Sequence, residues 1–393
     1  MNVPAMKIRQ KLPVEDDLGR ECVSDVEEAS HLAEILSRSG EIALMDLDAE
    51  VGTGDNLKII KTLCARFPCR VRGGIRSVER GRALLRAGAE RIVVGRDADL
   101  DLLRSFRPVH LILEVDSSRE DVSARFHEAE QFCHGFLVTA LPASADTQRV
   151  DVEEIRRLSM LTERRLCAEV DEITLEEIAT LDHVGVDVQV GKALHEGRIV
   201  AAEALSACVS WAPDGTVPTV VQDVAGQVLM VALSSRESLE KTLRSGEGTY
   251  HDPERGGIRR KGERSGNDQL VLRCVPSCDR TALLFLVRQA GNACHTGSYS
   301  CFGERDFGLD FLSEVAALKR SSDPSSSYTA RLLGDPDLRS AKIREKVDEI
   351  AHARRRDEAQ WAIADLVYFL VVESVSRGLT WAEIIRELRG RQR

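Results

Sequence analysis

Short apolar runs alternate with amphipathic segments over the first 205 or so residues. The apolar runs include EIALMDLD at 41–48 and VHLILEVD at 109–116, and segments with helical periodicity lie at 56–67, 77–88 and 174–185. Repeated strand–helix units form a parallel sheet, which is either open or closed into a barrel. The alternation therefore predicts an α/β fold for this part of the chain.

The alternation stops near SWAPDGTVP at 210–218, where proline and glycine interrupt it. Residues 217–303 carry β-rich runs around a single helical segment, which indicates a small α+β module. Beyond residue 307, four amphipathic segments with short connections predict an all-α helical bundle, with the apolar segment ADLVYFLVVESV at its centre. We therefore predict three domains, at residues 1–208, 214–303 and 307–393.

Length and charge limit the kinds of partner. A chain of 393 residues has room for two or three domains with cores of their own. Its formal net charge of −10 argues against a nucleic-acid partner, because binding phosphates needs clustered Lys and Arg. The sequence has no run of 18 apolar residues and begins with no recognisable export or transit signal, so we expect no membrane partner and a cytoplasmic location.

Ten cysteines in a cytoplasmic protein are expected to be reduced. Six lie singly in apolar or helical contexts and are interpreted as packing residues: Cys22, Cys64, Cys69, Cys133, Cys167 and Cys208. Cys278, Cys294 and Cys301 are closer together, and three thiolates with one open position suit a catalytic Zn²⁺. On spacing alone, a zinc site and three buried thiols remain open alternatives. His295 beside them is a ligand, a general base or a turn residue.

Four blocks in order within 217–302 carry a resemblance: TVVQDVAGQVLMVALSSRESLEKTLRSGEGTYH, RRKGERSGNDQ, PSCDRTALLFLV and GNACHTGSYSCF. This region resembles phosphoribosyl-AMP cyclohydrolase of histidine biosynthesis. The resemblance implies zinc ligands at Cys278, Cys294 and Cys301, and a homodimer with sites at the subunit interface. It also implies a magnesium site in an acidic block of which only Asp279 remains here. His295 is the candidate proton shuttle, and Asp279 is the second catalytic candidate.

A glycine-rich segment supplies the predicted substrate contacts of this module. Lys261, Ser265 and Gly266 offer a cation, a hydroxyl and a backbone amide to a substrate phosphate. Arg255 and Thr296 complete the predicted set. The alternative is a plain hairpin with a solvated lysine.

Carboxylates in the C-terminal bundle suggest a second metal site. Glu345 and Glu349 share a helix face, and Asp365 on the next helix can meet them, which gives either an oxygen-lined Mg²⁺ site or a solvated stripe. The segment LKRSSDPSSSYTARLLGD and the helices after it resemble phosphoribosyl-ATP pyrophosphohydrolase, an all-α family. The resemblance implies substrate contacts at Ser327, Tyr328 and Arg331.

That family carries Glu-Glu-x-x-Glu on one helix and Glu-x-x-Asp on the next. Here Lys346 and Ala362 stand at two of these five positions. A lysine beside a dication is repelled by it. We therefore expect the bundle to fold while its pyrophosphohydrolase site is weak or inactive.

The blocks EIALMDLDAEVGTGDNLKIIKTL, VRGGIRSVERGRALLRAGAERIVVGRDA and VGVDVQVGKALHEGRI resemble the (β/α)₈ phosphoribosyl isomerase of the same pathway. The resemblance implies one phosphate cradle at Gly73, Gly74 and Gly95. Asp171 and Glu172 stand where the second cradle needs glycines, so we expect that cradle to be lost.

The isomerase's acid–base pair is matched loosely by Asp16 and Asp116. Because about 205 residues are few for a full barrel, we expect a degenerate or partial barrel with a structural or dimerising role. The competing view is that no closed barrel forms.

Together, these resemblances imply a hydrolase of histidine biosynthesis whose substrate is a small phosphoribosyl nucleotide. The middle module would open the purine ring of phosphoribosyl-AMP with zinc, followed by an impaired pyrophosphohydrolase bundle. The alternative is a non-catalytic paralogue that acts as a scaffold or regulator, because all three regions have lost ligand or phosphate positions.

Overall fold

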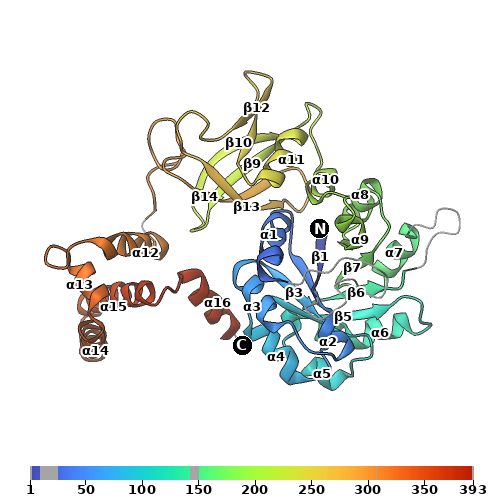
Figure 1. Cartoon of the computed structure of the whole chain (residues 1–393), viewed down its shortest axis with the longest axis horizontal. Coiled ribbons are helices and arrows are strands. Elements are labelled where there is room, and N and C mark those ends of the chain that lie inside the picture. The colour runs from blue at the N-terminus through green and yellow to red at the C-terminus, as the bar shows by residue number, and fades with distance from the viewer. Residues whose placement is uncertain (1, 9–24, 142–149, 307, 392–393) are drawn as a thin grey trace. The chain divides into compact units, whose positions relative to one another are not determined.

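The computed structural model describes residues 2–8, 25–141, 150–306 and 308–391 (Figure 1). They form two compact units. The first contains the N-terminal region and most of the middle module up to Gly297, and the second contains residues 224–227 and 298 onward.

The N-terminal region is a closed barrel of eight parallel strands in sequence order. The strands are β1 (Asn2–Ile8), β2 (Ile42–Asp46), β3 (Cys69–Arg72), β4 (Arg91–Val94), β5 (Leu111–Asp116), β6 (Gly135–Thr139), β7 (Arg165–Val170) and β8 (Asp187–Val190). The barrel closes where Val3 of β1 pairs with Gln189 of β8. The prediction of a β/α barrel is therefore confirmed. The barrel has all eight strands, so the expectation that it would be partial is wrong, as is the alternative without a closed barrel. Strands of only four to seven residues allow eight strand–helix units to fit into this length.

Helices surround the barrel. They are α1 (Val26–Ser37), α2 (Leu47–Val51), α3 (Leu57–Arg66), α4 (Val78–Arg86), α5 (Leu100–Arg104), α6 (Val122–Ala129), α7 (Val152–Ser159), α8 (Leu175–His183), α9 (Lys192–His195) and α10 (Ala201–Ala207). Several begin at a side-chain cap, such as Ser77 before α4 and Thr174 before α8, whose hydroxyl oxygens accept backbone N–H bonds.

Two apolar layers stabilise this barrel. Its lumen is filled by side chains from five strands: Ala43, Val93, Ile112, Leu137 and Cys167. A second, larger layer lies between the strands and the helices, where Ile59 and Ile60 of α3 and Phe126 of α6 are fully buried. In strands β2 to β8, most residues are buried on both faces, as is typical of parallel strands covered by helices.

The middle module is a six-stranded sheet with the order β12-β11-β10-β9-β14-β13. Its elements are β9 (Thr216–Asp223), β10 (Val228–Ser235), α11 (Arg236–Ser245), β11 (Thr249–Asp252), β12 (Gly257–Arg260), β13 (Gln269–Pro276) and β14 (Leu283–Gln289). The edge strand β13 is fastened to the barrel region, because the Cys274 N–H donates to the Arg38 carbonyl at 2.8 Å. The Arg38 side chain in turn donates to the carbonyls of Leu243 and Arg244 at the end of α11.

The second unit is helical, as predicted. Its α-helices are α12 (Leu309–Leu318), α13 (Tyr328–Gly334), α14 (Pro336–His352), α15 (Arg356–Ser376) and α16 (Trp381–Arg391). Helix α15 contacts α12, α13 and α14, so the prediction of a central apolar helix is confirmed. By length and composition α15 could also cross a membrane, a test that core helices of soluble proteins pass as well. Its residues Phe369, Val371 and Val372 are buried against the other helices.

Candidate functional site

The turn between β13 and β14 carries two predicted site residues, the exposed Cys278 and its neighbour Asp279. The Asp279 Oδ1 atom accepts hydrogen bonds from the Ser277 hydroxyl at 2.6 Å and from the Thr281 N–H at 3.2 Å. These donors lower the pKa of Asp279 to about 2, so the group is a carboxylate at neutral pH. One oxygen of this candidate ligand therefore holds the turn that presents Cys278.

Arg280 fixes the same turn to the barrel region. Its Nε and Nη2 atoms donate to the two carboxylate oxygens of Asp182 in α8, at 2.6 and 2.9 Å. Its Nη1 atom donates to the Ser277 carbonyl at 3.1 Å. The Asp182 side chain is only 2% exposed, so the pair is largely shielded from solvent. The orientation of the Cys278 turn is thus coupled to the barrel by a bidentate ion pair.

The predicted phosphate-binding segment lies beside the loop that carries Cys294. The Lys261 Nζ atom donates to the carbonyl of Ala293, the residue before Cys294. The backbone turns sharply at Gly262, where φ is +84° and a Cβ atom would lie 2.2 Å from Asp268 Oδ1. Lys261 and Cys294 are therefore brought together by the fold, although 33 positions separate them in the sequence.

The other predicted substrate groups of this module are at the surface. The Gly266 N–H donates to the Gly262 carbonyl at 2.8 Å, and the Ser265 Oγ atom accepts the Asn267 N–H at 3.3 Å, so both help to form the turn. Arg255 is exposed in the turn between β11 and β12. His295 and Thr296 are also exposed, and the Thr296 Oγ1 atom lies 3.0 Å from the Cys294 Sγ atom.

Burial separates the cysteines into two groups. Six of the nine described cysteines are buried: Cys64, Cys69, Cys133, Cys167, Cys208 and Cys274. The three predicted zinc ligands differ, because Cys278 and Cys301 are exposed and Cys294 is half-buried. The packing role is confirmed for five of the predicted six, while Cys22 lies outside the described residues. The alternative of three buried thiols is therefore wrong.

The three accessible thiols have donor chemistry that suits zinc. Within the described part of one chain, however, no group of three or more Cys, His, Asp or Glu side chains is arranged to hold a metal ion. Cys278 and Cys294 belong to the first compact unit and Cys301 to the second.

A lysine ammonium lies among the carboxylates of the helical unit. The Lys346 Nζ atom is 2.9 Å from Glu349 Oε2, 3.0 Å from Asp365 Oδ2 and 4.0 Å from Glu345 Oε1. The hydrogen bonds that the ammonium donates to Glu349 and Asp365 raise the pKa of Lys346, so the amine stays protonated. The structure thus brings together Glu345, Glu349 and Asp365 as predicted, but around an ammonium of the chain itself. The buried Ala362 lines the same hollow.

The predicted substrate residues of the helical unit cluster at the start of α13. The Ser327 Oγ atom accepts the Ala330 N–H at 3.3 Å and caps the helix. The Arg331 guanidinium lies 5.1 Å from the centre of the Tyr328 ring, and Tyr328 is 41% exposed. These side chains share one surface, and part of their arrangement is explained by helix capping and a cation–π contact.

The three glycines of the predicted phosphate cradle differ in their surroundings. Gly73 and Gly74 have φ values of +122° and +63°, and Cβ atoms there would lie 2.3 Å from the Asp46 carbonyl and 2.5 Å from the Ala49 carbonyl. The Gly74 N–H donates to Glu50 Oε2 at 2.9 Å, so a carboxylate of the chain occupies this amide. Gly95 has open space around its Cα.

Of the other predicted barrel residues, Asp116 and Glu172 form hydrogen bonds or ion pairs with nearby side chains. Asp116 accepts hydrogen bonds from the hydroxyl and N–H of Ser118 and from Arg96, and these donors lower the pKa of Asp116. Asp16 lies outside the described residues. Glu172 pairs with Arg198 at 2.6 Å, and Asp171 is exposed.

Sequence reasoning missed two residues that shape these sites. Arg280 directly follows Asp279 in the sequence, and its partner Asp182 is 98 positions away. Glu50 lies in a short helix that the sequence pattern did not predict. Neither residue has a local signal, because each acts through a partner that only the fold brings close.

Models of three protein families match the chain. One described as phosphoribosyl-AMP cyclohydrolase matches residues 230–303, and one described as phosphoribosyl-ATP pyrophosphohydrolase matches residues 310–392. A third, described as histidine biosynthesis protein, matches residues 4–126. The three matches follow one another along the chain and correspond to the three regions described above.

Curated relatives match a little under half of the chain. The histidine biosynthesis bifunctional protein HisIE of Pyrococcus furiosus is 36% identical over 200 residues, which cover 47% of this chain and 96% of that protein. HisIE of Bacillus subtilis is 36% identical over 192 residues, covering 45% and 92%. The histidine biosynthesis trifunctional protein of Neurospora crassa is 40% identical over 176 residues, but the chain spans only 20% of its length.

Proposed function

Because this chain belongs to the family of HisIE-type bifunctional histidine biosynthesis proteins, we propose that its middle module hydrolyses the purine ring of phosphoribosyl-AMP. The observation that carries the proposal is the exposure of the cysteines. Among the described cysteines, only the three at the family's ligand positions are accessible to solvent. Cysteines that serve only as packing groups are among the most buried residues of a protein.

Zinc is the cofactor that we propose for Cys278, Cys294 and Cys301. When bound by three protein ligands, zinc lowers the pKa of a coordinated water toward neutrality. Since the described part of one chain gathers no complete ligand set, we propose that a second copy of the chain completes the site in a homodimer.

The chain's own residues would bind and orient the nucleotide. The Lys261 ammonium lies at the loop that carries Cys294 and supplies a positive charge for the substrate phosphate. Exposed His295, next to Cys294, can carry a proton on an imidazole nitrogen during ring opening. Asp279 keeps its negative charge in the turn beside Cys278 and remains the proposed magnesium ligand and second catalytic group.

We further propose that the pyrophosphohydrolase region is impaired. A divalent cation would have to displace the Lys346 ammonium from Glu349 and Asp365, and it would be repelled if the ammonium stayed nearby.

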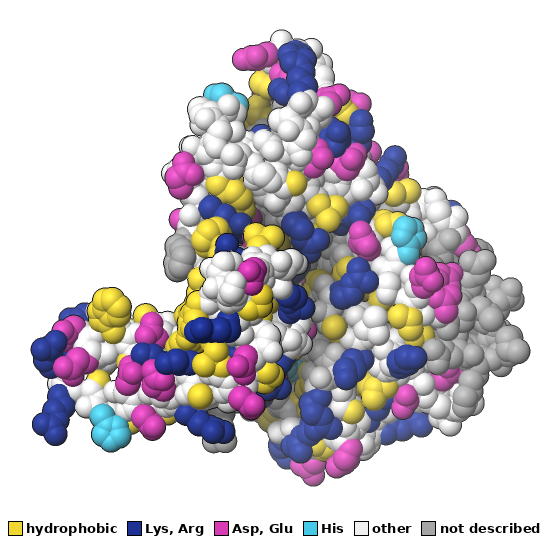
Figure 2. Space-filling model, turned by 60° about the vertical axis from the view of Figure 1, so that its left-hand side comes forward, with side chains coloured by type: hydrophobic (Ala, Val, Ile, Leu, Met, Phe, Trp, Pro, Cys, Tyr) yellow, Lys and Arg dark blue, Asp and Glu magenta, His cyan; other side chains and the backbone are white. Residues whose placement is uncertain are grey.

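The barrel is proposed to have a structural role, because the Gly74 N–H already donates its hydrogen bond to Glu50. The cytoplasm is the proposed location. On the face shown in Figure 2, charged side chains of both signs are interspersed.

The decisive experiment is a ring-opening assay on the full-length protein. Purified chain is incubated with phosphoribosyl-AMP and Zn²⁺, with and without Mg²⁺, and ring opening is followed by absorbance. We expect activity in the wild type, a loss of at least 100-fold in Cys294→Ala, and little change in the matched control Cys133→Ala, whose thiol is buried in the core of the barrel region. Wild-type activity equal to that of Cys294→Ala would instead favour a non-catalytic scaffold or regulator.

A further inference from the structure

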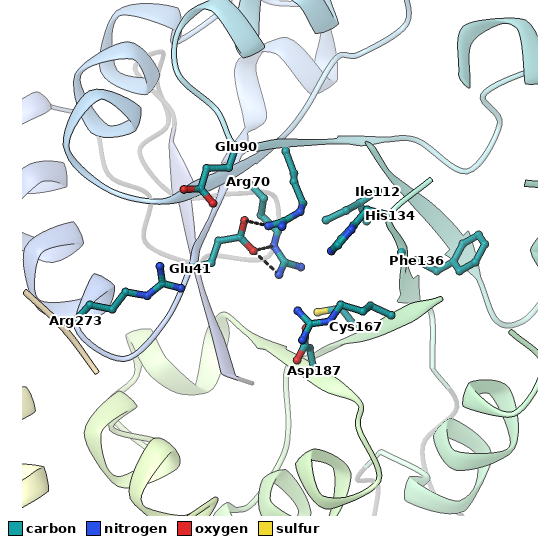
Figure 3. Close-up of a pocket in the computed structure, with 12 residues that line it drawn as sticks. Glu41, Arg70, Glu90, Ile112, His134, Phe136, Cys167, Asp187 and Arg273 are labelled. Carbon is teal, nitrogen blue, oxygen red and sulfur yellow. Dashed lines mark hydrogen bonds and ion pairs between the residues drawn. The ribbon is translucent and has the colours of Figure 1, made fainter. Parts of the chain in front are cut away.

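A polar cavity lies at the end of the barrel where the strands begin (Figure 3). Gly73 and Gly74 follow the last residue of β3 and so belong to the opposite end of the barrel. The volume of the cavity is about 170 Å³. About 10–15 Å³ is enough to hold one water molecule, so the cavity has room for a small polyatomic ligand. This cavity takes no part in the function proposed above.

Positive charge exceeds negative charge around the cavity. Four arginines line it, namely Arg70, Arg91, Arg165 and Arg273. Three carboxylates also line it, namely Glu41, Glu90 and Asp187. Glu41 is shared by two of the arginines. Its Oε2 atom accepts from Arg70 Nε and Nη2 at 2.9 and 2.7 Å, and its Oε1 atom accepts from Arg91 Nη1 at 2.9 Å. The Arg70 and Glu41 side chains are 6% and 5% exposed, so this network is a fixed part of the interior.

Arg273 reaches the cavity from outside the barrel, on edge strand β13 of the middle module (Figure 3). The pairing of β13 with β14 shifts register between Val271 and Arg273, which marks a β-bulge. A bulge changes the face to which the following side chains point. Cys274 after it is buried in the sheet, while Arg273 lines the cavity.

Two buried donors at this cavity are unsatisfied. The Nε atoms of Arg91 and Arg273 have no hydrogen-bond partner among the described residues, although both atoms are shielded from solvent. A buried donor without a partner costs about 1–3 kcal/mol, and more when the group is charged. A water molecule would satisfy the hydrogen bonds but would not balance the charge, whereas an anion does both.

The histidine of the cavity fits this interpretation. Burial and the nearby positive charges of Arg91 and Arg165 lower the pKa of His134, so the ring is neutral at pH 7. It adds no charge to the site but can donate or accept one hydrogen bond.

We propose that this cavity binds a small oxyanion of the phosphate class, held between the arginines of the barrel and Arg273 of the middle module. Guanidinium groups bind such anions through paired, charge-assisted hydrogen bonds. Since β13 leads directly into the turn that presents Cys278, an anion bound here would also hold the two parts of the first unit together at this point.

The test is a calorimetric titration of the full-length protein with inorganic phosphate at constant ionic strength. We expect saturable binding to the wild type and at least tenfold weaker binding to Arg273→Met. The matched control Arg86→Met, an exposed arginine of α4, should bind as the wild type does. Arg165→Met, an exposed position at the cavity, provides a second variant should Arg273→Met fail to fold.

Two further measurements locate the bound ion. Binding that persists in Lys261→Ala places the ion away from the predicted substrate segment. In a titration monitored by NMR, phosphate should raise the pKa of His134. Ribose 5-phosphate in a parallel titration shows whether the site takes free phosphate only or also the phosphoryl group of a larger molecule. The proposal is wrong if the wild type binds phosphate no better than chloride, or if the Arg273→Met and Arg165→Met variants both bind it as well as the wild type.

Discussion

At the scale of single residues, the three glycines predicted as a phosphate cradle have different roles. Gly73 and Gly74 have a backbone conformation that L side chains rarely adopt, and each approaches a carbonyl too closely for a Cβ atom. Gly95 has neither constraint. Two of the glycines are thus explained by the packing of the β3 loop against α2, whatever the barrel binds.

We predict that Gly74→Ala lowers the free energy of unfolding by about 2–4 kcal/mol, because the alanine is strained and collides with the Ala49 carbonyl. Gly95→Ala should change it by less than about 0.5 kcal/mol. Chemical denaturation of both variants measures the difference. Equal stabilities would show that the loop can rearrange around the added methyl group.

The sequence predicted which residue types could act, but not which partners they meet. The spacing of Cys278, Cys294 and Cys301 identified the three thiols that the structure leaves accessible. It could not reveal that the Gly74 amide is occupied by Glu50, because a backbone amide leaves no mark in the sequence. The same holds for Arg280, whose partner Asp182 lies 98 positions earlier, in the barrel region.

At the scale of elements, helices α14 and α15 place the carboxylates of the helical unit around one ammonium. Lys346 lies one helical turn before Glu349 and across from Asp365. It supplies one positive charge where a magnesium ion would supply two. The ammonium forms ion pairs with Glu349 and Asp365, and these pairs need no metal ion.

We predict that the double variant Lys346→Glu, Ala362→Glu gains a Mg²⁺ site. It restores five carboxylates, and magnesium prefers oxygen ligands of this kind. Added MgCl₂ should raise its midpoint of thermal unfolding by several degrees and leave the wild type unchanged. Pyrophosphate release from phosphoribosyl-ATP should rise by at least tenfold.

Lys342→Glu is the control, because it makes the lysine-to-glutamate change of the double variant on the same helix α14 but leaves Lys346 between Glu349 and Asp365. This variant should show no response to magnesium. If it responded as the double variant does, the effect would come from net charge and not from a rebuilt site.

Helix positions were predicted more closely than the closure of the sheet. The periodic segments 56–67, 77–88 and 174–185 correspond to α3, α4 and α8 within one or two residues at each end. Their caps and apolar spacing are local signals. Closure depends on the pairing of β1 with β8, whose residues are separated by most of the region, and no local pattern reports that contact.

At the scale of the whole molecule, the barrel and the middle sheet belong to one compact unit. Arg38 and Arg280 both join them, in opposite directions. Arg38 comes from the barrel region and donates to carbonyls at the end of α11, while Arg280 comes from the sheet and pairs with Asp182. The two parts are therefore expected to unfold together.

We predict that Arg280→Met lowers the free energy of unfolding at pH 7 by about 3 kcal/mol, because it leaves the buried Asp182 carboxylate without this partner. Burial is the largest single effect and raises the pKa of Asp182, but nearby positive charges, with the hydrogen bonds from Arg280 first among them, together outweigh it and lower the folded-state pKa. The stabilisation is thus present above pH 4 and is lost as the pH falls below it. Urea unfolding at pH 7, 5 and 3.5 should show the wild-type advantage shrinking.

Arg264→Met, an exposed arginine of the same module, is the control and should match the wild type at each pH. An advantage over Arg280→Met that stayed constant down to pH 3.5 would mean that packing of the long side chain, and not the charge of Asp182, stabilises the joint.

The lysine within the acidic cluster also affects how the molecule depends on its surroundings. A counter-ion that is part of the polypeptide cannot be removed by a chelator, exchanged for another ion or diluted away. The charge balance of the helical unit is consequently set when the chain is synthesised, and its stability should not vary with the concentration of free magnesium in the cell.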